Sequence, residues 1–161
     1  MSTELTPRDL TAPDVLLGTG LGSGFLPKAP GTWGTVLAVL LWIPIATLPL
    51  LWQLLIIVAY FFIGWWCSTR ISARYGLDDA GQIVADEIVG MWLALVWLPD
   101  VWWIWIIAFA LFRLLDIAKP GPIGWLDKQV KGGLGVMLDD LVAGGLAGGV
   151  LYLSIWVFYS L

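Results

Sequence analysis

The chain has 161 residues, of which 60% are hydrophobic and 12% are charged, and its mean hydropathy is +0.89. Soluble domains carry about 25% charged residues, so this composition excludes an ordinary soluble protein and predicts an all-α integral membrane protein. The net charge of −4 says little by itself, because the acidic residues are interleaved with Lys and Arg around the loops. No nucleic-acid partner is expected. The length suits one compact domain over residues 1–161, in which residues 1–30 form a polar N-terminal segment.

The first long apolar run predicts two membrane spans. Residues 36–68 are almost wholly apolar and too long for one crossing of about 20 residues. Pro44 and Pro49 interrupt this run, so we expect spans at about 34–49 and 51–69. A polar stretch, residues 70–82, follows and is expected to form a loop or a surface helix. A second polar stretch, residues 118–133, contains Pro120, Pro122 and paired glycines and is expected to be a loop.

The rest of the chain predicts three further spans, some of them short. Residues 83–117 are broken at Pro99 and Asp100, which favours a hairpin of two spans, and residues 134–161 can cross once with tilt. The hairpin places every basic residue on one side, and the positive-inside rule makes that side cytoplasmic. These basic residues are Arg8, Lys28, Arg70, Arg74, Arg113, Lys119, Lys128 and Lys131. We therefore expect a bundle of about five spans, with its N-terminus and its motif-bearing loops in the cytoplasm.

Small residues and tryptophans are both consistent with a membrane bundle. Residues 143–149 repeat Gly and Ala at a spacing of four, which allows helix backbones to approach closely within one chain or in a homo-oligomer. Many of the 12 tryptophans lie near predicted span ends, where indole rings favour the membrane interface. Trp33 has a second interpretation, as part of a substrate groove.

Acidic residues at the cytoplasmic ends of two spans indicate a cation site. Asp86 and Glu87 open the third span, and Asp139 and Asp140 lie a turn or two inside the fifth. Isolated carboxylates at such depth cost about 3 kcal/mol each, so they need partners. Oxygen-rich clusters of this kind suit Mg²⁺, and Asp116 is a further candidate ligand. The alternative is that these acids form buried salt bridges with nearby basic residues.

Basic residues near the same span ends are suited to binding phosphate. Arg113 can form a two-pronged contact, while lysines act as point charges. The candidates are Lys28, Thr32, Arg113, Lys119 and Lys131. The absence of histidine excludes a phosphohistidine intermediate, and Cys67 and Arg70 are wrongly spaced for a cysteine phosphatase. Metal-assisted attack on phosphorus, by water or by an aspartate, remains.

Four ordered motifs resemble bacterial phosphatidylglycerophosphatase A, over about residues 18–150. They are Lys28-Ala-Pro-Gly-Thr-Trp-Gly-Thr35, Asp86-Glu-Ile-Val-Gly-Met-Trp92, Phe112-Arg-Leu-Leu-Asp-Ile-Ala-Lys-Pro120 and Gly132-Gly-Leu-Gly-Val-Met-Leu-Asp-Asp140. The resemblance implies a Mg²⁺-dependent enzyme of the bacterial inner membrane. Its expected reaction converts phosphatidylglycerophosphate to phosphatidylglycerol and phosphate. Some members carry a histidine before the second motif, whereas this chain has Asp78 and Asp79 there, which we interpret as solvated loop charges.

The site expected from these arguments has three parts. The catalytic residues are Asp86, Glu87, Asp139 and Asp140, the metal ligands are these four and Asp116, and the phosphate ligands are the five residues listed above. The main alternative is a small cation transporter or channel, since intramembrane acids also suit a cation pathway. A transferase acting on a nucleotide-linked lipid is less favoured, because the acidic signature expected of that class is missing.

Overall fold

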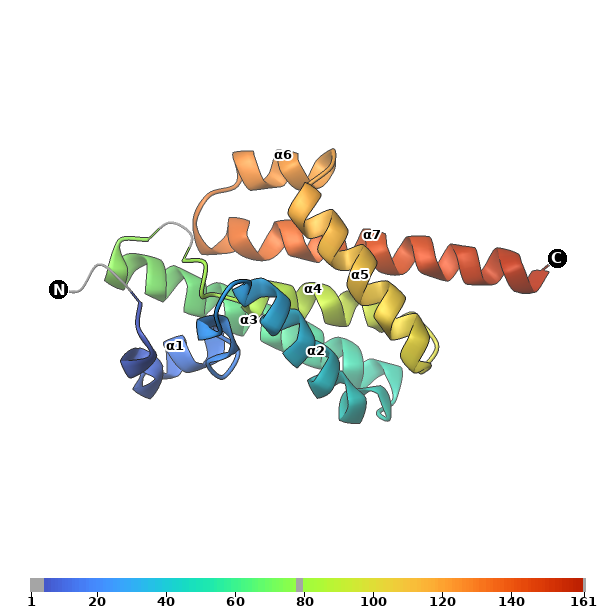
Figure 1. The fold of residues 1–161 in the computed structure, drawn as a ribbon, viewed down its shortest axis with the longest axis horizontal. Coiled ribbons are helices and arrows are strands. Elements are labelled where there is room, and N and C mark those ends of the chain that lie inside the picture. Colours follow the sequence, from blue (N-terminus) through green and yellow to red (C-terminus); the bar gives the residue numbers. More distant parts are fainter. Residues whose placement is uncertain (1–4, 78–79, 161) are drawn as a thin grey trace.

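The computed structural model describes residues 5–77 and 80–160, and within them the protein is all-α (Figure 1). Two short 3₁₀ turns, η1 and η2, flank the first helix. The elements in chain order are η1 (Pro7–Thr11), α1 (Pro13–Gly18), η2 (Ser23–Phe25), α2 (Pro30–Ala46), α3 (Leu50–Tyr75), α4 (Ala85–Leu95), α5 (Trp102–Ala118), α6 (Pro122–Gln129) and α7 (Gly132–Ser160). The predicted all-α class is therefore confirmed.

The centre of the molecule is α4, the short helix predicted as the third span. It contacts α2, α3, α5 and α7, and most of its residues are buried. Its 11 residues extend only about 16 Å, roughly half of a bilayer core. Hydrophobic residues on nearly all sides let α4 form the core of the bundle, with the longer helices around it.

Glycines bring α4 and α7 into backbone contact. A Cβ atom placed on Gly144 would lie 2.0 Å from the carbonyl oxygen of Gly90. A Cβ atom on Gly148 would similarly lie 2.6 Å from the carbonyl oxygen of Ala94. The small residues of 143–149 thus pack within one chain, and this close approach holds the acidic ends of α4 and α7 together.

Each of the five predicted spans corresponds to a helix in the structure: α2, α3, α4, α5 and α7. Among the described residues, α3 and α7 are long and apolar enough to cross a membrane, and α2 is a shorter apolar helix. Pro49 caps the N-terminus of α3, as its position between two apolar runs predicts, whereas Pro44 lies inside α2. Two helices thus have the length and composition to span a membrane, and the five-span arrangement stays a prediction.

Both polar stretches contain helix. The first extends α3 to Tyr75, where Gly76 ends the helix with a positive φ of 69°. The second contains α6, which follows a turn at Gly121 with φ of 52°. Asp78 and Asp79, interpreted above as solvated charges, lie outside the described residues.

An ion pair attaches the N-terminal segment to α3. Asp14 of α1 is buried, with its Oδ2 atom 2.7 Å from Arg74 and 3.5 Å from Arg70. The hydroxyl of Tyr60 also donates a hydrogen bond of 3.0 Å to the carbonyl oxygen of Leu17. Residues 1–30 are therefore polar in sequence but, where the structure describes them, part of the packed domain.

Candidate active site

Three carboxylates from two helices meet at one end of the core. Asp86 and Glu87 lie in the first turn of α4, and Asp140 faces them from α7. One oxygen from each lies within 4.8 Å of the other two. The positive end of the α4 dipole favours carboxylates in its first turn. The structure thus brings together three of the residues that the sequence predicted to share a cation.

Two oxygens of this cluster are buried without a hydrogen-bond donor among the described residues. They are Oε2 of Glu87 and Oδ2 of Asp140. A buried carboxylate oxygen with no donor is costly, because it loses its contacts with water and gains none in return. A bound cation would satisfy both atoms, so the cluster has the chemistry of a metal site.

A polar cavity of about 250 Å³ opens beside the cluster. Its walls come from α4, α5, α6, α7 and the segments next to them. Its lining is Ile83, Asp86, Glu87, Asp116, Lys119, Asp127, Val130, Lys131, Gly132, Gly135, Val136, Asp139 and Asp140. Six of these side chains are carboxylates and two are lysines, so the cavity combines cation ligands with groups that attract phosphate.

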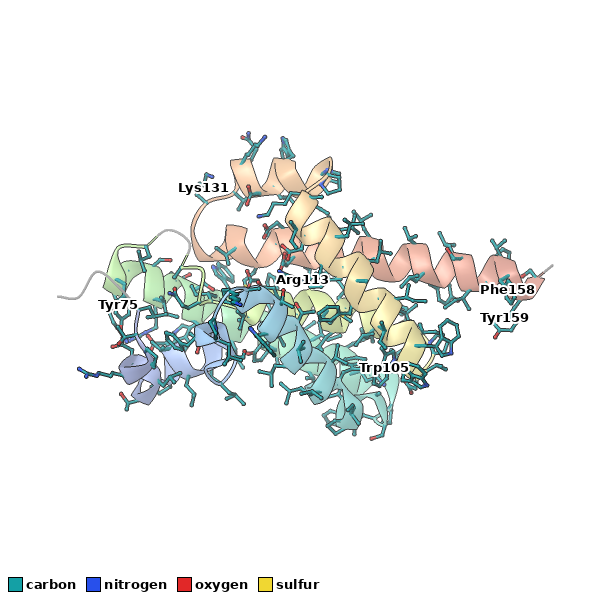
Figure 2. All side chains as sticks on the ribbon, in the orientation of Figure 1. Tyr75, Trp105, Arg113, Lys131, Phe158 and Tyr159 are labelled. Atoms are coloured by element: carbon teal, nitrogen blue, oxygen red, sulfur yellow. The ribbon has the colours of Figure 1, made fainter. Side chains whose placement is uncertain are left out.

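Arg113 of α5 reaches the cluster from the side of α2 (Figure 2). Its Nη1 atom lies 3.7 Å from Oε1 of Glu87 and also pairs with Asp116 on the same helix. Its Nε atom is buried and has no acceptor among the described residues. Arg113 is therefore held in place by two carboxylates and still has donor capacity left.

Lys119 links three segments around the cavity. It ends α5 with a positive φ of 44°, and its Nζ atom lies 2.6 Å from Oδ2 of Asp139 and also bonds Asp127 of α6. Burial by itself lowers the pKa of Lys119, but hydrogen bonds and charge from Asp127 and Asp139 outweigh it and raise the pKa above its usual value. The same hydrogen bond lowers the pKa of Asp127. Lys119 is thus a fixed positive charge at the cavity wall.

The sequence prediction did not include Asp127. Its only sequence signal is a carboxylate in a polar stretch beside Lys128, a pattern that usually indicates a solvated surface. The turn after α5 folds α6 back, so that Asp127 reaches Lys119 and lines the cavity. Lys131 also lines the cavity and donates a 3.2 Å hydrogen bond to the backbone of Asp127 (Figure 2).

The first motif meets the site through a glycine rather than through Lys28 or Thr32. Lys28 is exposed in the loop before α2, Thr32 is half-buried, and neither lines the cavity. A Cβ atom on Gly31 would lie 2.1 Å from Oε1 of Glu87 and 3.0 Å from Nη1 of Arg113. Gly31 therefore lets the first turn of α2 lie directly on the charged groups, a role that sequence analysis had not assigned.

The five predicted metal ligands separate into two sets. Asp86, Glu87 and Asp140 form the cluster, while Asp116 pairs with Arg113 and Asp139 pairs with Lys119. Adjacent helical residues point about 100° apart, which explains why Asp139 and Asp140 diverge. Salt bridges thus account for Asp116 and Asp139, whereas the arrangement of Asp86, Glu87 and Asp140 suits a shared cation.

Comparison with known proteins identifies the family. The Phosphatidylglycerophosphatase A family matches residues 16–155, a range that includes all four motifs. The chain belongs to the phosphatidylglycerophosphatase A family. No solved structure matches it. Membership confirms the resemblance drawn from the motifs and favours a hydrolase over a cation transporter.

Three relatives cover most of the chain. Phosphatidylglycerophosphatase A of Escherichia coli is 44% identical over 85% of this chain and 80% of the relative. The Haemophilus influenzae protein of the same name is 40% identical over 83% of each. A Bacteroides thetaiotaomicron protein, provisionally named phosphatidylinositol-3-phosphatase, is 42% identical over 89% of this chain and 94% of its own length. All three names describe phosphatases of phospholipid headgroups.

Proposed function

We propose that the protein is a Mg²⁺-dependent lipid phosphatase that converts phosphatidylglycerophosphate to phosphatidylglycerol and phosphate. Family membership supports the reaction, and two relatives carry the corresponding name. The observation that carries the proposal is the carboxylate cluster of Asp86, Glu87 and Asp140 beside fixed basic side chains. This combination suits hydrolysis of a phosphate monoester, because it supplies both cation ligands and groups that stabilise phosphoryl charge.

The reaction adds one water molecule across the terminal P–O bond. The water oxygen becomes attached to phosphorus, the bond from phosphorus to the glycerol oxygen breaks, and that oxygen takes a proton. A carboxylate of the cluster accepts the proton that water gives up, acting as a general base. A cavity of about 250 Å³ has room for the phosphate and for water.

The donor set fits Mg²⁺. Asp86, Glu87 and Asp140 would hold the ion, through carboxylate oxygens that include the two buried ones without donors. Six carboxylates line the cavity, whereas Arg113, Lys119 and Lys131 are the nearby cations among the described residues. The resulting excess of negative charge is what a divalent cation would neutralise. When bound, Mg²⁺ polarises the phosphate and lowers the pKa of coordinated water.

The basic residues orient and stabilise the phosphate. Asp116 and Glu87 hold Arg113, and Asp139 and Asp127 hold Lys119, so neither side chain must be ordered when substrate arrives. In this proposal Asp116 and Asp139 position basic residues rather than bind metal. Lys131 adds a third positive charge at the exposed edge of the cavity. Lys28 and Thr32 are further candidates for the lipid headgroup as it approaches α2.

We further propose that the protein crosses the bacterial inner membrane several times, with its site facing the cytoplasm. The two long apolar helices and the positions of α2, α4 and α5 support this arrangement, together with the distribution of basic residues. Cysteines introduced at Asp100 and Lys128 would test it in intact cells. A membrane-impermeant thiol reagent should label Asp100→Cys and spare Lys128→Cys, and the reverse labelling would contradict the orientation.

The activity is tested with purified protein in detergent. Phosphate release from phosphatidylglycerophosphate should require Mg²⁺, stop with a chelator, and fall at least about 100-fold in Glu87→Gln, because metal sites depend strongly on their ligands. Asp100→Asn is the matched control, since Asp100 is exposed between α4 and α5. A parallel assay with phosphatidylinositol 3-phosphate covers the substrate named for the Bacteroides relative. A folded protein that releases no phosphate, or releases it equally without metal, would overturn the proposal.

A further inference from the structure

An apolar groove of about 360 Å³ runs between α2 and α5. Four residues of α2 between Val36 and Ile43 form one wall, and four residues of α5 between Trp102 and Phe109 form the other. On each helix the lining residues recur at spacings of three and four, so each wall is a single helix face. The lining contains almost no polar surface, in contrast to the neighbouring cavity of carboxylates and lysines.

The groove lies within two helical turns of residues of the candidate active site on both helices. On α5, Phe109 precedes Arg113 by one turn, about 6 Å along the axis. On α2, the groove begins at Val36, little more than a turn beyond Gly31, which lies against Glu87 and Arg113. Figure 2 shows Arg113 and Trp105 at two separate positions along α5. A ligand that binds both places would have a charged end and an apolar end.

The length of the groove along α5 is close to the thickness of the hydrocarbon layer of one lipid leaflet. Trp102, at its far end, precedes Arg113 by 11 residues, which corresponds to about 16 Å along a helix. The hydrocarbon core of a bilayer is about 30 Å thick, so one leaflet contributes about 15 Å. An acyl chain whose headgroup lies at the level of Arg113 therefore extends about as far as the groove does.

We propose that the groove between α2 and α5 binds an acyl chain of the glycerophospholipid substrate while its terminal phosphate lies at the carboxylate cluster. This inference rests on the lipid phosphatase function proposed above. The groove thus adds a binding site that favours long-chain lipids over water-soluble phosphate esters.

The test narrows the groove and compares substrates of different chain length. Val39→Phe adds a ring to the α2 wall, and Val58→Phe is the control, because Val58 is exposed on α3 and outside the groove. We measure kcat/KM for dipalmitoyl and dihexanoyl phosphatidylglycerophosphate in the same detergent. The long-chain to short-chain ratio should fall about tenfold in Val39→Phe, the loss expected when about two methylenes are no longer buried. The ratio should stay unchanged in Val58→Phe.

The outcomes distinguish a failure of the groove proposal from a failure of the proposed phosphatase activity. An unchanged ratio in Val39→Phe, with active wild-type protein, overturns the groove and leaves the activity standing. No phosphate release from either substrate by folded wild-type protein overturns the function instead. If Val39→Phe does not fold, wild-type protein is crosslinked with phosphatidylglycerophosphate that carries a diazirine in one acyl chain. Crosslinks within residues 36–43 or 102–109 support the groove, and crosslinks found solely on other helices overturn it.

Discussion

Acidic side chains in two regions of this protein differ in how many basic partners they have. In the N-terminal segment, one carboxylate, Asp14, faces two guanidinium groups, from Arg70 and Arg74. In the candidate active site, six carboxylates line one cavity with far fewer basic partners. Asp14 thus has two basic partners within the described residues, whereas the carboxylates of the cavity outnumber the basic side chains near them.

The contrast shows which buried charges indicate function. Burying a carboxylate is costly, so a chain that keeps one must gain stability from its partners or gain function from leaving it partly unsatisfied. Asp14 has partners at 2.7 and 3.5 Å and attaches α1 to α3. Asp140 is equally buried, yet it forms no ion pair with a basic side chain among the described residues. An acidic cluster without enough donors therefore indicates a binding site, and a matched pair indicates structure.

The largest expected effect comes from removing one charge of the cluster. Asp140→Asn should lower phosphate release at least about 100-fold, because it removes a ligand of the proposed metal site. In chelator, the same variant should unfold at a higher temperature than wild-type protein, because one of several mutually repelling carboxylates has been neutralised. Activity assays and thermal unfolding in detergent measure the two effects. Near-normal activity would place Asp140 outside the catalytic machinery.

Mg²⁺ itself should stabilise the folded protein. A ligand that binds the native state alone adds about 2.7 kcal/mol at a concentration 100 times its Kd, so the unfolding temperature should rise as Mg²⁺ is added. Asp14→Asn should keep this rise and Asp140→Asn should lose it, because only Asp140 belongs to the cluster. An equal rise in both variants would show that Mg²⁺ binds elsewhere.

Removing the charge of Asp14, which pairs with Arg70 and Arg74, should lower stability and leave activity unchanged. Asp14→Asn should destabilise the protein by about 1 kcal/mol, because Arg70 and Arg74 lose their shared acceptor but stay partly in contact with water. Activity per folded molecule should not change. Asp100→Asn, at an exposed position, is the control and should leave stability within about 0.5 kcal/mol of wild type. A loss of activity in folded Asp14→Asn would contradict a purely structural role.

The three cluster carboxylates could be predicted from the sequence more fully than the residues that surround them in the structure. Asp86, Glu87 and Asp140 are recognisable because carboxylates at the ends of apolar helices are rare. That Asp139 and Asp140 diverge follows from helix geometry, but which of them faces the cluster depends on how α7 is rotated against α4. The close contact of Gly144 with Gly90 fixes that rotation in three dimensions. The helix pattern likewise follows from the apolar runs and the proline breaks, because these features are local.

Other parts of the site could not be predicted, because they depend on the course of the chain between helices. Helix α6 lies in a stretch that contains Pro and paired glycines and was expected to be a loop. The positive φ angles of Lys119 and Gly121 turn it back over α7, which brings Asp127 to Lys119. The importance of Gly31 similarly depends on a neighbour 56 positions away, Glu87, and no local pattern indicates it.

The smallest expected effect concerns the ion pair of Asp127 with Lys119 at the cavity edge. It tests whether this pair serves structure, as Asp14 does, or catalysis, as proposed for the cluster. Asp127→Asn removes one of the two acceptors of Lys119 and should lower kcat about two- to fivefold, because the pair is partly exposed and Asp139 still holds the lysine.

The pH dependence of kcat in Asp127→Asn shows whether Asp127 positions Lys119 or takes part in proton transfer. The lowered pKa of Asp127 means that its stabilising contact is present above the unfolded value of 3.8 and is lost as pH falls through the lower folded pKa. The raised pKa of Lys119 means that its contribution is complete below 10.5 and is lost as pH rises through the higher folded pKa. Both groups are therefore ionised between about pH 5 and 9. Asp127→Asn should lower kcat by the same factor throughout that range, and a factor that varies with pH would show that Asp127 takes part in proton transfer.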